Sequence, residues 1–164
     1  MKRLQGKGYP DIQTRGFVRL LSTHNRLVGR ELGPSHLGVF ALMDFDPDGL
    51  AIMSTYKHGS VSLAHENDSL VAERLEWLGI TSDVIRDIHR DKSQAWPKLT
   101  PHDRRKALKM LEKPVCQEEI ETSWRRELQV MLMFNIKAEI QILGQCANLE
   151  GYLSSELQSH MSPI

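Results

Sequence analysis

The spacing of apolar residues in the first third of the chain predicts a helix, a buried strand and a second helix. Residues 12–27 carry apolar side chains at near-helical spacing, which predicts the first helix. Residues 37–43 form a short and almost uninterrupted apolar run, which is typical of a strand buried on both faces in a parallel sheet. Apolar residues resume at Leu50, directly after an acidic loop, and predict a helix that ends near residue 57. This order of elements indicates an α/β layer fold.

The rest of the chain is predicted to be mostly helical. Thr100 followed by Pro101 is a favourable helix start, because threonine caps helix N-termini and proline suits the first helical position. Apolar residues step by three or four along residues 118–147, which predicts one long helix or two in tandem. We expect one domain over residues 1–157 and a frayed tail over residues 158–164. The other predicted elements are a short strand over 61–64 and helices over 71–78, 81–89 and 101–111.

Composition narrows the class of protein. The chain has 164 residues, of which 40% are hydrophobic and 26% charged, and this fits one globular domain. It contains no apolar run of about 18 residues, so we expect no membrane-spanning segment. Two cysteines do not make a disulfide scaffold, which favours reduced thiols in a cytosolic or nuclear compartment. The 21 basic and 21 acidic side chains balance, which argues against a diffusely basic nucleic-acid binder.

The neutral total hides an uneven distribution of charge. Residues 1–30 carry seven basic side chains against one acidic side chain, Asp11, and the rest of the chain is correspondingly acidic. A basic face near the N-terminus could meet phosphate groups, while an acidic remainder could hold a metal ion. A solvated helix face explains the same charges equally well. A second basic cluster leaves the same two alternatives open and consists of Arg104, Arg105, Lys106 and Lys109.

The acidic loop after the buried strand carries the clearest candidate chemistry. Asp44 and Asp46 are two residues apart in an extended segment, so their side chains are predicted to point to the same side and to converge on one hard cation. Pro47 and Gly49 then set a tight turn into the next helix. Oxygen ligands at the end of a strand are what magnesium-assisted phosphodiester chemistry needs. The simpler alternative is that the two aspartates only cap the helix.

The sequence of this loop partly matches two other kinds of site, a calcium-binding loop and a phosphatase active site. A calcium loop of the EF-hand type would need glutamate at its twelfth position, where Thr55 stands, and a helix rather than a strand before it, so this interpretation is rejected. A phosphatase with Asp44 as the nucleophile usually has a hydroxyl residue two positions after the second aspartate, where this chain has Asp48. The phosphatase remains a weaker alternative.

Six segments carry a resemblance to a known family, and they occur in family order over nearly the whole chain. The segments are GKGYPDIQTR (6–15), ALMDFDPDG (41–49), STYKHGS (54–60), WLGITSD (77–83), WRREL (124–128) and IKAEIQ (136–141). The last segment includes Lys137 and Glu139, on a predicted helix where a solvated face is the alternative. Together the six segments resemble the topoisomerase VI A-subunit family, and its eukaryotic meiotic double-strand-break branch more than its archaeal one.

The resemblance implies a fold and a chemistry. The fold is an α/β, Toprim-like domain, a partly parallel sheet flanked by helices, with a helical C-terminal elaboration. The chemistry is a type II topoisomerase-like transesterification, in which a tyrosine cleaves both strands of DNA with Mg²⁺ and so starts meiotic recombination. Asp44 and Asp46 match the metal ligands of the family, Lys7 and Arg15 match basic positions beside the site, and Lys57 is a further candidate DNA contact.

The implied partners and location follow from the same resemblance. They are double-stranded DNA, a second copy of the chain, and a topoisomerase VI B-like partner protein, on chromosomes in the nucleus, with no membrane.

The chain also departs from the family pattern. The family carries a glutamate ligand on a strand before the glycine loop and a nucleophilic tyrosine on an upstream winged-helix domain, and neither has a counterpart here. Tyr9, Tyr56 and Tyr152 fall in Toprim-like or C-terminal segments, so none fits the nucleophile. We therefore expect a fragment with a truncated first strand that does not cleave DNA alone. A non-catalytic DNA-binding or assembly module of the same fold is the alternative.

Overall fold

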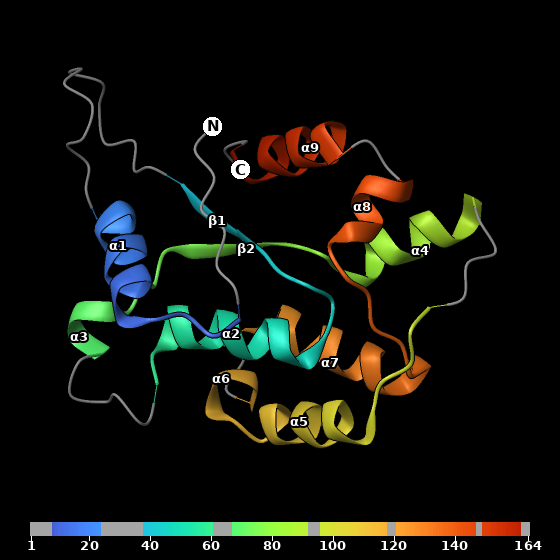
Figure 1. The fold of residues 1–164 in the computed structure, drawn as a ribbon, viewed down its shortest axis with the longest axis horizontal. Coiled ribbons are helices and arrows are strands. Elements are labelled where there is room, and N and C mark those ends of the chain that lie inside the picture. The colour runs from blue at the N-terminus through green and yellow to red at the C-terminus, as the bar shows by residue number, and fades with distance from the viewer. Residues whose placement is uncertain are drawn as a thin grey trace. The chain divides into compact units, whose positions relative to one another are not determined.

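The computed structural model describes six stretches of the chain, which belong to two compact units (Figure 1). The described residues are 8–23, 38–60, 67–91, 96–117, 121–146 and 149–161. Unit 1 comprises Met1–Ala41 and Ala51–Trp77, and unit 2 comprises Leu42–Leu50 and Leu78–Ile164.

The predicted strand is present, but only Ala41 of its residues is buried rather than the whole strand, and it pairs with a strand that the sequence pattern did not predict. β1 (Val39–Leu42) lies beside β2 (Leu75–Gly79) in a parallel two-stranded sheet (Figure 1). The pairing continues past β1, where the backbone N–H of Met43 donates to the carbonyl of Gly79 over 2.7 Å. The helix predicted over 71–78 is therefore wrong, because pairing with β1 overrides the helical preference of Leu75 and its neighbours.

Unit 1 contains α1 (Ile12–Thr23), which packs against α3 (Asn67–Leu70). Asp11 accepts a hydrogen bond of 2.6 Å from the backbone N–H of Thr14 and so caps α1. Arg19 of α1 donates to the carbonyl of Val71 over 2.6 Å, which ties the helix to the segment after α3. The last predicted turn of the first helix, residues 24–27, and the predicted strand over 61–64 lie outside the described residues.

Helix α2 (Pro47–His58) follows the acidic loop as predicted. Pro47 occupies its first position, where the missing N–H of proline costs nothing. Leu50 and Met53 are fully buried, and Asp48 in the first turn suits the positive end of the helix dipole, so both features stabilise this short helix.

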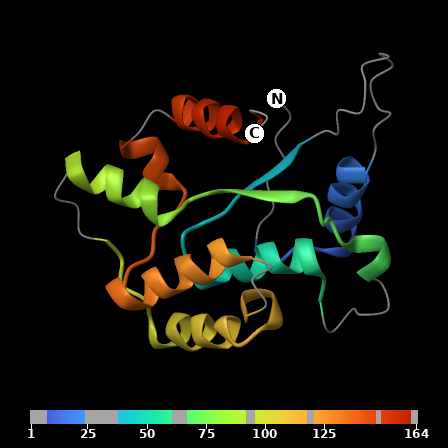
Figure 2. The ribbon, with the colours of Figure 1, turned by 180° about the vertical axis from the view of Figure 1, so that it is seen from behind.

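Unit 2 is mostly helical, and α5, α6 and α7 pack against one another (Figures 1 and 2). The predicted start of α5 is confirmed, because Thr100 and Asp103 form a capping box with Pro101 at the first position. The core of these helices contains Met110, Trp124, Leu128 and Met131. The helices of unit 2 are α4 (Ser82–Asp91), α5 (Pro101–Leu111), α6 (Pro114–Gln117), α7 (Thr122–Phe134), α8 (Gln141–Cys146) and α9 (Leu149–Met161).

The predicted helical region over 118–147 contains two helices with a non-helical segment between them. Asn135 ends α7 in the left-handed conformation, with φ of 55°, which asparagine tolerates better than most residues. Residues 136–140 are not helical, and Ala138 pairs with Phe45 in an antiparallel bridge. Long-range pairing thus decides the conformation of a segment whose local pattern indicates a helix.

The C-terminal segment is a helix rather than a frayed tail as far as Met161, because α9 continues four residues beyond Leu157. The hydroxyl of Tyr152 on α9 donates to the carbonyl of Leu78 over 2.7 Å. None of the described helices has the length and apolar character needed to cross a membrane.

Tyr152→Phe is expected to lower the free energy of unfolding by about 1 kcal/mol, because the carbonyl of Leu78 loses its donor. Burial raises the pKa of Tyr152 to about 12. The stability that this shift contributes is present below the ordinary tyrosine pKa and is lost as the pH rises through about 12. Absorbance at high pH should show a tyrosine step near pH 12 in the wild type, which Tyr152→Phe removes and which Tyr9→Phe and Tyr56→Phe retain. If Tyr9→Phe removed that step instead, the step could not belong to Tyr152.

Candidate metal centre

The two aspartates predicted as metal ligands are held by backbone N–H groups from different parts of unit 2. Asp46 accepts a hydrogen bond of 2.6 Å through Oδ1 from the backbone N–H of Gly49, so it caps α2. Asp44 accepts one of 2.7 Å through Oδ1 from the backbone N–H of Ile140. Each bond engages one oxygen and leaves the second oxygen of each carboxylate as a potential metal ligand. Capping and metal binding, the two alternatives for Asp46, are therefore compatible.

The residue between the two aspartates anchors the loop. Phe45 is completely buried, and its N–H and C=O pair with Ala138 over 2.8 and 3.0 Å. Because side chains alternate along an extended backbone, burying Phe45 on one side directs Asp44 and Asp46 to the other. The segment 136–140 thus holds the loop through Phe45 and through the side chain of Asp44.

The electrostatic environment of Asp46 fits a cation. Burial raises the pKa of Asp46, and the negative charges of Asp44 and Asp48 raise it further. The N–H of Gly49 and the positive charge of Lys137 act in the opposite direction without cancelling the shift. A half-buried carboxylate next to two others is unfavourable when ionised, and a hard divalent cation would relieve that repulsion through oxygen ligands. The donor set of this loop therefore fits Mg²⁺.

Two ion pairs lie next to the loop. Lys106 of α5 pairs with Asp48. Lys137 donates to Oδ2 of Asp103 over 2.9 Å, and the same oxygen accepts from the backbone N–H of Thr100. Burial alone would raise the pKa of Asp103, but the hydrogen bonds from Lys137 and Thr100 outweigh it and hold the pKa below its usual value. The hydrogen bond with Asp103 raises the pKa of Lys137.

Within the described residues, one group of three side chains has the spacing of a metal site. Ligand atoms of Asp48, His102 and Asp103 lie within 4.8 Å of one another, and this group does not include Asp44 or Asp46. Its two carboxylates are the partners of Lys106 and Lys137, so its negative charge is already compensated. The sequence pattern missed Asp103, and the signal that could have found it is its position three residues after the helix cap.

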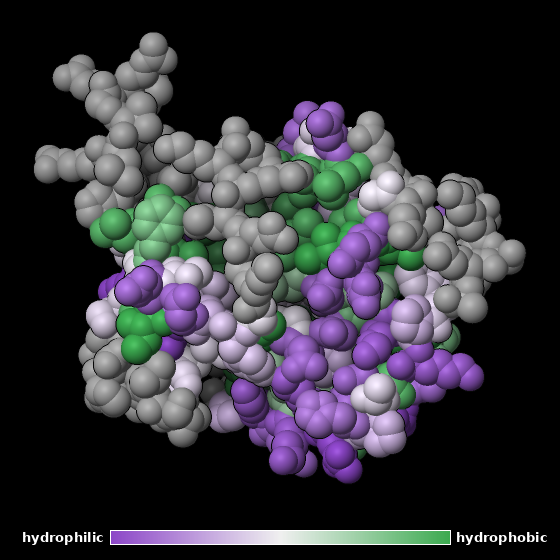
Figure 3. Space-filling view, in the orientation of Figure 1, coloured by the Kyte–Doolittle hydropathy of each residue, from purple (hydrophilic) through white to green (hydrophobic). Residues whose placement is uncertain are grey.

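The second basic cluster has internal partners as well as a solvated face. Arg104 donates to the carbonyl of Leu132 and to the side chain of Asn135, over 3.3 and 3.2 Å, and so binds the C-terminal end of α7. Arg105 and Lys109 are exposed, and hydrophilic side chains gather over α5 in Figure 3.

The three residues predicted to contact DNA belong to unit 1. Lys7 lies outside the described residues. Arg15 is 1% exposed on α1, which fits a structural role better than a direct surface contact. Lys57 is half-buried in the last turn of α2, where its charge suits the negative end of the helix dipole. Their predicted DNA contacts stay predictions.

Comparison with known proteins gives the family. The family model for the Toprim domain of the topoisomerase 6 A-subunit and Spo11 matches residues 4–157. The chain belongs to this family. The predicted family and the Toprim-like α/β fold are therefore confirmed.

Members of the topoisomerase 6 A-subunit/Spo11 family from plants and animals match most of the chain. Meiotic recombination protein SPO11-1 of Oryza sativa subsp. indica is 36% identical over 144 residues, which are 88% of this chain and 35% of that protein. Meiotic recombination protein SPO11 of Mus musculus is 36% identical over 138 residues, 84% of this chain and 32% of that protein. The A3 subunit of DNA topoisomerase 6 from Oryza sativa subsp. indica is 34% identical over 141 residues, 86% of this chain and 29% of that protein. The chain thus spans about a third of the length of these relatives.

Proposed function

We propose that this chain is the Mg²⁺-binding Toprim portion of a protein that makes DNA double-strand breaks in meiotic recombination. The observation that carries the metal assignment is the half-buried carboxylate of Asp46 beside Asp44 and Asp48, with its pKa raised. Two of its relatives are named meiotic recombination proteins, which supports a role in meiotic recombination. The proposal includes type II topoisomerase-like chemistry on double-stranded DNA, a homodimer, a topoisomerase VI B-like partner and a nuclear location.

Each residue of the proposed site has a defined role. Asp44 and Asp46 would hold the ion through oxygens not engaged by Ile140 and Gly49. When bound, Mg²⁺ supplies positive charge that neutralises a phosphodiester during its cleavage. Lys7, Arg15 and Lys57 stay proposed DNA contacts, with the burial of Arg15 favouring an indirect contribution.

Two of the three tyrosines of this chain are poor nucleophiles on chemical grounds, and the third, Tyr9, lies in the Toprim-like segment 6–15 rather than in a winged-helix segment. Burial raises the pKa of Tyr56 as well as that of Tyr152, so both hydroxyls hold their protons more tightly than a free tyrosine does. Tyr152 is also committed to the carbonyl of Leu78. We therefore expect the 164-residue polypeptide alone to form no covalent adduct with DNA.

A non-catalytic DNA-binding or assembly module is the second candidate function. The observation that favours it is that two lysines of the protein itself, Lys106 and Lys137, pair with Asp48 and Asp103. Family membership favours both DNA-related functions over the phosphatase alternative that uses Asp44.

Magnesium titration of the wild type and of Asp46→Asn tests the metal site. At ten times the dissociation constant, Mg²⁺ is expected to raise the free energy of unfolding of the wild type by about 1.4 kcal/mol. Asp46→Asn should lose this stabilisation, because asparagine retains the capping oxygen for Gly49 but carries no charge. Since the raised pKa of Asp46 makes its ionised form unfavourable at neutral pH, the metal-free variant should be at least as stable as the wild type.

Calorimetric titration with Mg²⁺ and thermal melts provide the measurement. Glu112→Gln is the matched control, because Glu112 is an exposed acidic residue of the same unit, at the end of α5. The control should bind Mg²⁺ like the wild type. Equal Mg²⁺ binding by Asp46→Asn would contradict the site, and no Mg²⁺ binding by the wild type would favour the non-catalytic module.

A further inference from the structure

Lys137 lies in a different environment from the one that its sequence predicts. The pattern places it on a helix, with a solvated face as the simpler interpretation. In the structure it belongs to the non-helical segment 136–140, and the residue after it, Ala138, pairs with Phe45 of the acidic loop. Two residues further, Ile140 donates to the side chain of Asp44. One short segment therefore positions both the candidate metal loop and Lys137.

Lys137 is held in place both at its backbone and at its ammonium group. Its backbone N–H donates to the carbonyl of Pro97 over 2.9 Å, and its Nζ donates to Asp103 over 2.9 Å. Asp103 is itself fixed, because it forms the capping box of α5 with Thr100. A lysine side chain ordinarily loses much rotamer freedom when it binds a ligand, and here that loss has already occurred on folding.

The charge of Lys137 acts on the candidate metal ligand as well as on its own partner. Lys137 lowers the pKa of Asp46, and Asp103, Asp46 and Asp48 all raise the pKa of Lys137. The side chain of Lys137 is 29% exposed, whereas that of Asp103 is 8% exposed. The side chain of Lys137 is thus the more accessible of the two partners from solvent. Because an ammonium group has three N–H donors, the bond to Asp103 leaves capacity for a further acceptor.

We propose that Lys137, oriented by Asp103, binds a phosphate group of DNA beside the metal ion held by Asp44 and Asp46. This inference rests on the proposed function, since it takes the metal site and the nucleic acid from there. A fixed ammonium group next to a metal-bound phosphate adds a second positive charge on the anionic backbone and fixes its register. A purely structural role, in which Lys137 only neutralises Asp103, is the alternative that the experiment excludes.

Binding of a fluorescein-labelled DNA duplex to the full chain, followed by anisotropy over a range of salt concentrations, tests the proposal. Lys137→Gln is expected to weaken Mg²⁺-dependent binding about tenfold and to reduce the slope of log K against log salt by about one. Its affinity for Mg²⁺ without DNA should be equal to or higher than that of the wild type, because a cation near Asp46 has been removed. Lys109→Gln, which changes an exposed lysine on α5, is the matched control and should leave both the Mg²⁺ affinity and the gain in DNA affinity on adding Mg²⁺ unchanged.

A second variant keeps the test decisive if Lys137→Gln fails to fold. Asp103→Asn keeps the charge of Lys137 but weakens the hydrogen bond that orients its ammonium group. The affinity for DNA in the presence of Mg²⁺ should therefore fall a few-fold, while the slope of log K against log salt stays that of the wild type. Unchanged DNA affinity and salt slope in Lys137→Gln, or unchanged affinity in Asp103→Asn, would overturn the role of Lys137 and leave the metal site standing. Absence of Mg²⁺ binding by the wild type would instead overturn the proposed function.

Discussion

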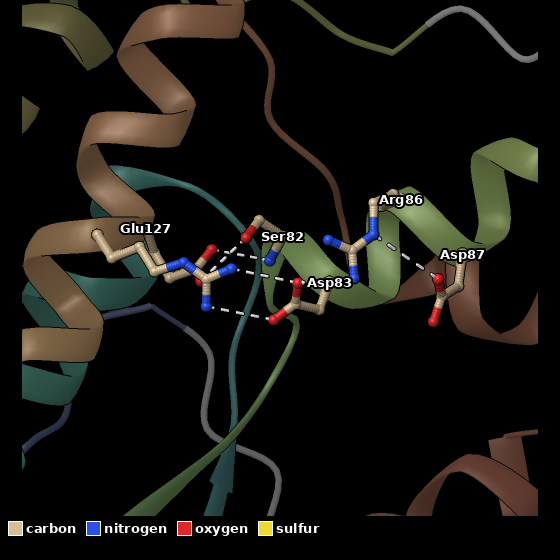
Figure 4. Close-up of polar contacts among 6 residues, drawn as sticks. Ser82, Asp83, Arg86, Asp87 and Glu127 are labelled. Carbon is tan, nitrogen blue, oxygen red and sulfur yellow. Dashed lines mark hydrogen bonds and ion pairs between the residues drawn. The ribbon is translucent and has the colours of Figure 1, made fainter.

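Glu127→Ala is expected to lower the free energy of unfolding by about 4 kcal/mol, which would be a large part of the stability of a domain of this size. The side chain is 3% exposed on α7 and accepts two hydrogen bonds from the first residue of α4. Its Oε2 accepts from the backbone N–H of Ser82 over 2.8 Å, and its Oε1 from the hydroxyl over 3.0 Å (Figure 4). The carboxylate therefore caps α4 from a neighbouring helix and meets the positive end of its dipole.

The loss should be large because alanine leaves two donors of Ser82 without their acceptor and opens a cavity in the packed interior. The exposed ion pairs in the same region are expected to matter far less. Asp83 pairs with Arg126 over 3.2 Å and with Arg86 over 3.0 Å, at side chains that are about half exposed. Solvent screening limits such pairs to about 0–1 kcal/mol.

Urea denaturation of three variants separates these contributions. Glu127→Gln retains an acceptor oxygen for Ser82 and should lose less stability than Glu127→Ala. Asp83→Asn serves as the control at the first turn of α4 and should change the free energy of unfolding by less than about 1 kcal/mol. If Glu127→Ala lowered the free energy of unfolding by less than Asp83→Asn does, the carboxylate of Glu127 would not hold α4.

Gly49→Ala is expected to cost about 3 kcal/mol and to abolish Mg²⁺ binding, because the acidic loop folds back closely over this position. A Cβ atom at Gly49 would lie 2.5 Å from the carbonyl oxygen of Asp44 and 3.3 Å from Oδ1 of Asp46. The first contact is with backbone, so relief requires the loop itself to move. That movement would disturb the bond from Gly49 to Asp46 and separate the two proposed ligands.

Gly144→Ala is the matched control for this substitution. Gly144 lies in α8, and a Cβ atom there would meet nothing within 4 Å. Alanine at such a helical position should leave stability unchanged or raise it by about 0.5–1 kcal/mol, with normal Mg²⁺ binding. Chemical denaturation and calorimetric titration of both variants provide the comparison. Normal Mg²⁺ binding by Gly49→Ala would show that the proposed site tolerates movement of the loop or lies elsewhere.

The sequence by itself determined the elements whose causes are local. The apolar run before Asp44 predicted β1, and the pair Thr100–Pro101 predicted the capped start of α5. These outcomes depend on neighbouring residues, such as the threonine oxygen that accepts from Asp103 three residues later. The candidate ligands Asp44 and Asp46 were found in the same way, from their spacing after a buried strand. The order of the six segments was sufficient to identify the family.

The tertiary structure decided what depends on partners distant in sequence. β2 formed, and the segment around Ala138 became non-helical, because β1 and Phe45 offered backbone hydrogen bonds that a local pattern does not contain. The same long-range pairing holds the segment of Lys137 against the acidic loop, and the side chain of Lys137 there binds Asp103 of α5. Local propensity differs by less than about 1 kcal/mol per residue, so pairing and burial override it. The sequence thus named the two carboxylates of the proposed metal site, and only the fold showed that the charge of Lys137 acts on one of them, Asp46.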